Sequence, residues 1–215
     1  MTASIAEKPL TPNDEGVSSD PVGRDALLAD DARGRIVYTP GFLDAGEAAA
    51  WFAELREGVV WKAERRQMYD REVDVPRLTG HFRLGPEDPG LPPAVRQAAA
   101  LVIRKTEVPF NSVGLNFYRD GRDSVAPHND HLNTIVPGFP IGLLSLGSAR
   151  RMSIRAKEPP TLGVIKQGRA RVIDVDLAPG SLLLMGYDTQ IHYTHGIPKT
   201  RDAVGGRISL AFRVQ

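Results

Sequence analysis

The sequence predicts an α+β fold in which helices come first and a sandwich or barrel of short strands follows. Helical periodicity is confined to the part of the 215-residue chain before residue 110, and short β-rich runs separated by Gly and Pro follow from about residue 111. The chain has the size of one domain, and its 41% hydrophobic and 25% charged residues suit a protein with a buried core. We therefore expect one folded unit after an N-terminal arm.

The arm is expected to be flexible and acidic over residues 1–34, where Pro, Asp, Ser and Gly are mixed without periodicity. Two cations and seven carboxylates give residues 1–31 a local charge of −5, although the whole chain carries only +1. The remaining residues therefore carry +6.

Two helices are expected before residue 110. A short strand, Ile36–Tyr38, comes first. The segment Asp44–Glu47 has the spacing of a capping box, which predicts a helix from there to about Arg56. The pair Pro92-Pro93 predicts the start of the second helix. The apolar positions on the buried side of this second helix are Val95, Ala98, Ala99, Val102 and Ile103.

Short strands dominate the rest of the chain. Turn residues separate them, which is typical of a sandwich or barrel rather than of alternating strands and helices. The expected strands are Val113–Tyr118, Ile141–Leu146, Met152–Arg155, Ala170–Val175, Ser181–Leu184 and Arg207–Val214.

Several classes of protein are excluded by what the sequence lacks. Without cysteine there is no disulfide scaffold, thiolate zinc site, iron–sulfur cluster or cysteine nucleophile, and a reducing compartment fits. No apolar run approaches the ~18 residues of a membrane-spanning helix, and the polar N-terminus predicts no secretory signal. Phosphate-loop, Rossmann and nucleophile-elbow patterns are absent, which argues against a kinase, a dehydrogenase and a serine hydrolase.

Three residues form a candidate metal site: His128, Asp130 and His195. Because His128 and Asp130 are separated by one residue, their side chains leave the same face of an extended segment. Two imidazoles and one carboxylate leave about three of six octahedral positions open, which suits a non-haem Fe(II) oxygenase. Taken by themselves, the two histidines are explained slightly better as ordinary core or surface residues.

The expected strand Arg207–Val214 has two distinct faces. Its apolar face consists of Ile208, Leu210 and Phe212. Arg207 and Arg213 lie on the other face, and guanidinium groups inside a barrel would need anions such as those of a dicarboxylate. Asn116 and Tyr118 likewise share one face of their strand. An exposed edge strand with solvated arginines explains the same pattern about equally well.

A basic stretch covers residues 147–171, with seven cations and one anion and thus a local charge of +6. Such a stretch is compatible with a phosphate backbone as partner and, equally, with a solvated hairpin.

Taken together in chain order, these segments carry a resemblance. They are Asn116-Phe117-Tyr118, His128-Asn129-Asp130, His195-Gly196-Ile197 and the pair Arg207 and Arg213. Their order and spacing resemble the AlkB-like Fe(II)/2-oxoglutarate dioxygenases, which remove alkyl groups from nucleic-acid bases. The resemblance is strong over residues 111–213 and extends more loosely back to about residue 36.

The resemblance implies an α+β fold with a double-stranded β-helix (jelly-roll) core and N-terminal supporting helices. It divides the AlkB-like dioxygenase domain, residues 35–215, into helices and a substrate-recognition lid over 35–110 and the jelly-roll core over 111–215. It implies Fe(II) as metal and 2-oxoglutarate as co-substrate. The catalytic and metal-binding residues would be His128, Asp130 and His195. The 2-oxoglutarate ligands would be Asn116, Tyr118, Arg207 and Arg213, with Arg207 on the distal carboxylate.

The resemblance also implies oxidative dealkylation of the DNA-repair type, which releases an aldehyde, succinate and CO2. The segment Val75–Thr79 resembles the start of the lid. The expected substrate contacts are Arg77, His81, Phe82, Met68, Tyr69, Arg150 and Arg151. The expected partners are O2 and alkylated DNA or RNA, preferably single-stranded. We expect a monomer with no membrane association in the cytoplasm, associated with the nucleoid of a bacterium or in the nucleus of a eukaryote.

The chain departs from the family pattern at positions that influence substrate choice. Leu132 stands where many members have an acidic residue, two positions after the iron-binding Asp. Gly80-His81-Phe82 follows the lid motif where aromatic residues are usual, and Ser209 and Ala211 replace polar residues. These changes leave the oxidative chemistry intact and leave the preferred base open.

Other functions are compatible with part of the pattern. A hydroxylase of a protein, lipid or small molecule needs the same iron and 2-oxoglutarate ligands without the lid. A non-catalytic jelly-roll binding module would not need the intact His128, Asp130 and His195. A zinc hydrolase could use these three ligands, but it gives no reason for the paired arginines.

Overall fold

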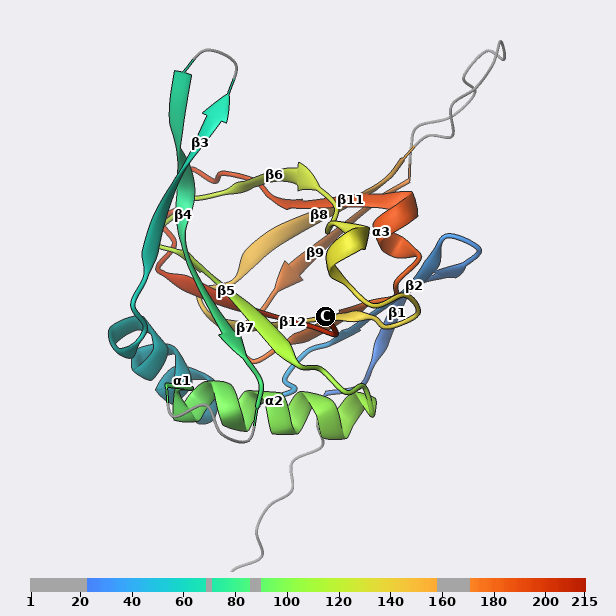
Figure 1. Cartoon of the computed structure of the whole chain (residues 1–215), viewed down its shortest axis with the longest axis horizontal. Coiled ribbons are helices and arrows are strands. Elements are labelled where there is room, and N and C mark those ends of the chain that lie inside the picture. The colour runs from blue at the N-terminus through green and yellow to red at the C-terminus, as the bar shows by residue number, and fades with distance from the viewer. Residues whose placement is uncertain (1–22, 69–70, 86–89, 158–170) are drawn as a thin grey trace, which may run out of the picture.

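Two antiparallel sheets face each other in the structure, a computed structural model that describes residues 23–68, 71–85, 90–157 and 171–215, with only the backbone for 66–68 and 71–74 (Figure 1). The large sheet comprises, in spatial order, β1 (Ala26–Asp31), β2 (Gly34–Thr39), β10 (Leu182–Met185), β7 (Ile141–Gly147), β12 (Arg207–Arg213), β5 (Ser112–Tyr118), β4 (Arg71–Arg83) and β3 (Lys62–Met68). The small sheet comprises β6 (Val125–His128), β11 (Tyr193–Ile197), β8 (Arg150–Ala156) and β9 (Val172–Leu177). This arrangement confirms the predicted α+β jelly-roll fold.

Two helices cover the outer face of the large sheet (Figure 1). The first, α1 (Ala45–Gly58), begins at the predicted cap, because the Asp44 side chain accepts a 2.9 Å hydrogen bond from the backbone N–H of Glu47. The second, α2 (Pro93–Thr106), begins at the predicted proline. Beneath them, the apolar face of β12 is fully buried, as its alternation predicts. Neither helix, nor the short α3 (Thr189–His192), is long and apolar enough to cross a membrane.

The part of the predicted N-terminal arm that the structure describes forms a strand. Residues 1–22 lie outside the described residues, but the prediction of an arm up to residue 34 is wrong over β1, which pairs with β2. Gly34, at a φ of 114°, closes the tight turn between the two strands. The carboxylate of Asp31 accepts hydrogen bonds from Arg33 and Arg171, so an acidic strand is stable at this edge.

A second core lies between the two sheets and leaves room for a cavity. Apolar side chains from both sheets pack there, among them Ile36, Leu143, Met152 and Ile154. The β3–β4 hairpin projects past one end of the sheets (Figure 1). The base of this hairpin is tied to the small sheet's entry loop, where the backbone N–H of Ser124 donates to the carbonyl oxygen of Pro76 at 2.8 Å.

Candidate active site

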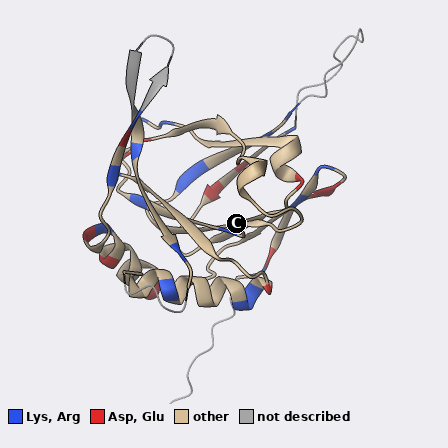
Figure 2. Ribbon diagram, viewed as in Figure 1, with Lys and Arg blue, Asp and Glu red and all other residues tan. Residues whose placement is uncertain are grey.

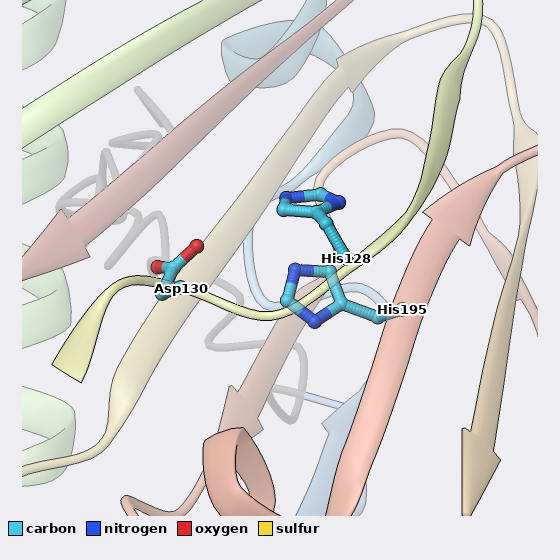
Figure 3. Close-up of side chains that lie close together, drawn as sticks. All are labelled: His128, Asp130 and His195. Atoms are coloured by element: carbon cyan, nitrogen blue, oxygen red, sulfur yellow. The ribbon is translucent and has the colours of Figure 1, made fainter. Parts of the chain in front are cut away.

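Two neighbouring strands of the small sheet bring the predicted metal ligands together. His128 on β6 lies directly opposite His195 on β11, and the centroids of the two rings are 4.5 Å apart. Asp130 follows two residues after His128, just beyond the end of β6. One ligand atom from each of the three side chains lies within 4.8 Å of the others. Figure 3 shows the three side chains directed toward a common space.

The ring of His128 is oriented by its own backbone. Its Nδ1 lies 3.0 Å from the carbonyl oxygen of Ala126, which can only accept a hydrogen bond, so Nδ1–H is the donor. Nε2 is then the ring nitrogen left for a metal. Gly196 lets β6 approach β11 this closely. A Cβ atom at Gly196 would lie 2.9 Å from the carbonyl oxygen of Val125 and 3.0 Å from the nitrogen of Pro127.

Asp130 is held in its ionised form by an arginine. Burial acts to raise the pKa of Asp130, but the charge and hydrogen bond of Arg213 outweigh it, so the pKa lies below its usual range. Nε of Arg213 donates to Oδ2 of Asp130 at 2.7 Å, and the side chains are only 22% and 10% exposed. The backbone N–H of Asp130 donates to the Gln190 side chain at 3.0 Å. One carboxylate oxygen of Asp130 therefore remains available to a metal.

His195 is neutral at physiological pH. Burial, together with the neighbouring His128 and Arg213, lowers the pKa of His195 to about 4 despite the opposite effect of Asp130. A neutral imidazole is the form that binds a metal.

A cavity of about 740 Å³ opens beside these three residues, between the two sheets. The face of β12 that carries Arg207 and Arg213 lines it, so the explanation of these arginines as solvated edge residues is wrong: β12 lies between β7 and β5. Arg207 is 1% exposed, and its Nη2 donates a hydrogen bond to Oγ of Ser145 at 2.9 Å. Its Nε and Nη1 have no partner among the described residues. A buried guanidinium with two unused donors is a site for an anion.

Asn116 and Tyr118 lie opposite Ser209 and Arg207 across the β5–β12 ladder, and both line the cavity. Oδ1 of Asn116 accepts a 2.7 Å hydrogen bond from Nε of Arg77, so the amide N–H groups of Asn116 are free to donate into the cavity. Burial raises the pKa of Tyr118 despite the nearby arginines, so the phenol stays protonated and can also donate.

These residues fit Fe(II) and 2-oxoglutarate. Two imidazoles and one ionised carboxylate form the facial donor set preferred by non-haem Fe(II). The unused donors of the buried Arg207, in the same cavity, match the far carboxylate of an oxo-diacid.

Only some of the predicted lid residues line the cavity. Arg77 lines the cavity, as expected of a substrate contact, whereas Phe82 packs against the core on the helix side of the large sheet. Phe82 therefore lies away from the cavity, against the expectation of a substrate contact, because the pairing of β4 with β5 places it opposite Val113 on the helix-covered face. His81 is exposed and does not line the cavity. Tyr69 and the side chain of Met68 lie outside the described residues.

The paired arginines of β8 point in opposite directions. Arg150 is 3% exposed, and its guanidinium donates to three backbone carbonyl oxygens, so its predicted contact with substrate phosphate is wrong. Arg151 lies outward and pairs with Asp176 at 3.0 Å, and Figure 2 shows the blue of β8 beside the red of β9. Leu132 is 37% exposed and does not line the cavity.

Two site residues were not singled out in the sequence. Gln190 anchors the backbone at Asp130, and Ser145 contacts Arg207. The alternation of β7 would place Ser145 with Leu143 on the inward face, which is a usable signal. Gln190 is 60 residues from Asp130 and gives no local signal.

The jelly-roll core, the two histidines and aspartate, and the adjoining anion site define a non-haem iron oxygenase of the 2-oxoglutarate-dependent class. The comparison with known families agrees: the chain belongs to the 2OG-Fe(II) oxygenase superfamily, whose pattern it matches over residues 35–213.

Relatives of the AlkB type confirm the narrower resemblance. The chain is 30% identical over 191 residues to the alpha-ketoglutarate-dependent dioxygenase alkB homolog 3 of Mus musculus, an alignment that covers 83% of this chain and 65% of the relative. It is 36% identical over 104 residues to the DNA oxidative demethylase ALKBH2 of Homo sapiens, which covers 48% of this chain and 39% of that relative. The chain thus spans less than two thirds of the length of either relative.

Solved structures share the fold at low sequence identity. A Pseudomonas putida prolyl-4-hydroxylase superposes with a TM-score of 0.52 at 15% identity, over 84% of this chain and 92% of the other. OsALKBH1 superposes with a TM-score of 0.53 at 13% identity, over 88% of this chain and all of the other.

Proposed function

We propose that the protein is an Fe(II)/2-oxoglutarate dioxygenase that removes alkyl groups oxidatively from nucleic-acid bases. The observation that carries the proposal is that the three metal donors and Arg207 line the same cavity, and that Arg207 is a buried cation with unused N–H groups. The substrate class is supported by the similarity to alkB homolog 3 and to the DNA oxidative demethylase ALKBH2.

His128, Asp130 and His195 would hold the iron, with Asp130 ionised and His195 neutral, as a metal requires. Iron with 2-oxoglutarate and O2 supplies oxidation of an N-alkyl carbon, coupled to decarboxylation of the co-substrate to succinate and CO2. Arg213 keeps Asp130 ionised, and Gln190 holds the adjacent backbone, so the metal donors are in position before any ligand arrives.

The large-sheet wall would hold 2-oxoglutarate. Arg207 would bind the distal carboxylate through its unpartnered N–H groups, while Asn116 and Tyr118 donate hydrogen bonds from the neighbouring strand. Arg213 already donates from Nε to Asp130 and from Nη1 to a backbone carbonyl, which leaves Nη2 for the co-substrate.

The substrate base would enter beneath the β3–β4 hairpin, where Val75, Pro76 and Arg77 form part of the cavity wall. The volume of about 740 Å³ exceeds the needs of a five-carbon diacid, which leaves room for a base rotated out of its strand. Because this rotation costs least without a complementary strand, we propose single-stranded DNA or RNA as preferred substrate. We also propose a monomer that acts in the cytoplasm, at the nucleoid or in the nucleus.

The test is aldehyde release from a panel of N-methyl and etheno-modified oligonucleotides, single- and double-stranded, DNA and RNA, with Fe(II) and 2-oxoglutarate. The expected result is aldehyde in proportion to succinate, highest with single strands and lower at high salt. Succinate formed without aldehyde across the whole panel would point to a hydroxylase of another substrate. No binding of iron or 2-oxoglutarate would leave only a non-catalytic binding module.

A further inference from the structure

Two buried arginines contact the ring of Tyr118. Cζ of Arg207 lies 5.3 Å from the ring centroid, and Cζ of Arg150, on the opposite sheet, lies 5.7 Å from it. Both distances are within the range of cation–π contacts. Arg207 is 1% exposed, Arg150 is 3% exposed and Tyr118 is 3% exposed, so the whole group is shielded from water.

Arg150 has neutral partners only. Its Nη1 donates to the carbonyl oxygen of Asp120 at 2.9 Å, and its Nη2 donates to those of Asp123 and Pro198 at 2.9 and 2.8 Å. The nearby carboxylates are engaged elsewhere, that of Asp123 with Arg119 and that of Asp120 with Arg122. Within the described ranges, no carboxylate contacts the guanidinium of Arg150.

Arg207, the other arginine beside the Tyr118 ring, also lacks a charged partner in the ranges that the structure describes. Its Nη2 donates to the neutral Ser145, and no carboxylate contacts it among the described residues. Burial lowers the pKa of Arg207 to about 10, and the positive charge of Arg150 acts in the same direction. The protein therefore holds two positive charges near one another, without a contacting counter-ion in the part of the chain that the structure describes. Such an arrangement costs free energy until an anion binds.

Resting on the function proposed above, we infer that Arg150 is a positioning residue for the co-substrate. Its hydrogen bonds hold the loop before β6 and the segment after β11, and its guanidinium holds the ring of Tyr118 beside Arg207. Its charge adds to that of Arg207 and strengthens the attraction for the distal carboxylate. Arg150 does not line the cavity, whereas Tyr118 and Arg207 do, so Arg150 acts through these two residues and does not touch the ligand.

The test compares two ligands that differ only at the distal end. 2-Oxoglutarate ends in a carboxylate, whereas 2-oxopentanoate keeps the oxo-acid end and finishes in a methyl group. Both are titrated by calorimetry into the full-length protein loaded with Mn(II). In Arg150→Gln, the affinity for 2-oxoglutarate is expected to fall about tenfold, because one charge near the carboxylate is lost in a low-dielectric site. The affinity for 2-oxopentanoate should change less than about twofold.

Two further variants separate charge from structure. Arg150→Lys keeps the charge but loses most of the fork of hydrogen bonds, so it should keep most of the preference for 2-oxoglutarate. Arg155→Gln removes an exposed arginine from the same strand and should change neither affinity. Thermal unfolding of each variant reports the structural contribution separately.

Three results would overturn the inference. An unchanged ligand preference in Arg150→Gln means that the charge has no effect on the site. If the affinity for both ligands falls equally in Arg150→Gln and in Arg150→Lys, Arg150 only supports the fold. The Lys variant decides this point even if the Gln variant does not fold. If the unaltered protein binds neither ligand, the proposed 2-oxoglutarate site itself fails, which is distinct from a failure confined to Arg150.

Discussion

The two walls of the cavity satisfy their charged groups in different ways. On the small-sheet side, His128 donates to the carbonyl oxygen of Ala126, and Asp130 accepts from Arg213, so two of the three metal donors have a protein partner that orients them. On the large-sheet side, Arg207 is buried with two N–H groups unused. The charged groups of the small-sheet wall have partners within the protein, whereas Arg207 in the large-sheet wall needs a bound anion to use its remaining N–H groups.

This difference shows which property each wall contributes. The metal wall depends on geometry, because its ligand atoms are already within 4.8 Å of one another. The co-substrate wall depends on charge, because its buried Arg207 lacks a contacting carboxylate among the described residues. Removing a residue from the metal wall should therefore have a different effect from removing one from the co-substrate wall.

The largest effect is expected for Asp130→Ala. The change removes a metal donor and leaves the charge of Arg213 without its partner, so aldehyde release should fall at least about 1,000-fold. Mn(II) affinity, measured by calorimetry, should fall with it. Gln190→Ala is the matched control, because it removes only the side chain that accepts the Asp130 backbone N–H; its loss should be about tenfold. Full metal affinity in Asp130→Ala would contradict the assignment.

The metal wall should also respond to pH. Burial lowers the pKa of His195 to about 4, whereas an unfolded histidine titrates near 6.5. Between these values the unfolded chain binds more protons, so the free energy of unfolding of the metal-free protein should decrease as the pH falls. The loss should total roughly 3 kcal/mol from above pH 6.5 down to pH 4. Urea unfolding at a series of pH values measures it, and His195→Gln should flatten the profile. A profile equally steep in that variant would assign the effect to other groups.

The charge-dependent wall is tested by Arg207→Met. Loss of a two-pronged contact with a carboxylate should weaken 2-oxoglutarate binding on the order of 100-fold. The melting temperature of the ligand-free protein should stay the same or rise, because an unneutralised buried cation is replaced by an apolar side chain. Calorimetry and thermal unfolding measure the two effects. A marked drop in melting temperature with unchanged 2-oxoglutarate affinity would make Arg207 structural only.

Strand alternation explains why much of the site could be predicted from the sequence. The two faces of β12 follow from its period of two, and the spacing of His128 and Asp130 places both on one side. The sequence does contain a local signal for the burial of Arg150. Arg150, Met152 and Ile154 alternate along β8, so all three side chains point inward. The face on which Phe82 lies depends on the pairing of β4 with β5, which no local pattern determines.

A contact between distant segments also escaped prediction. Arg77 and Asn116 are 39 residues apart, and their hydrogen bond exists only because β4 pairs with β5. Neither the lid motif nor the alternation of β5 indicates that a lid residue contacts the co-substrate wall. This contact is the link between the substrate entrance and the large-sheet wall.

The smallest effect is therefore expected for Arg77→Gln. Loss of the charged donor to Asn116 leaves that amide free to rotate, so 2-oxoglutarate affinity should fall about fivefold, although Arg77 is a lid residue. Calorimetry with the Mn(II) protein measures this, and Arg83→Gln, an exposed position on the same strand, is the control. If Arg77→Gln weakens only oligonucleotide binding and leaves 2-oxoglutarate affinity unchanged, the lid and the co-substrate wall act independently. A parallel loss of both affinities would instead show that the lid helps to complete the charge-dependent wall.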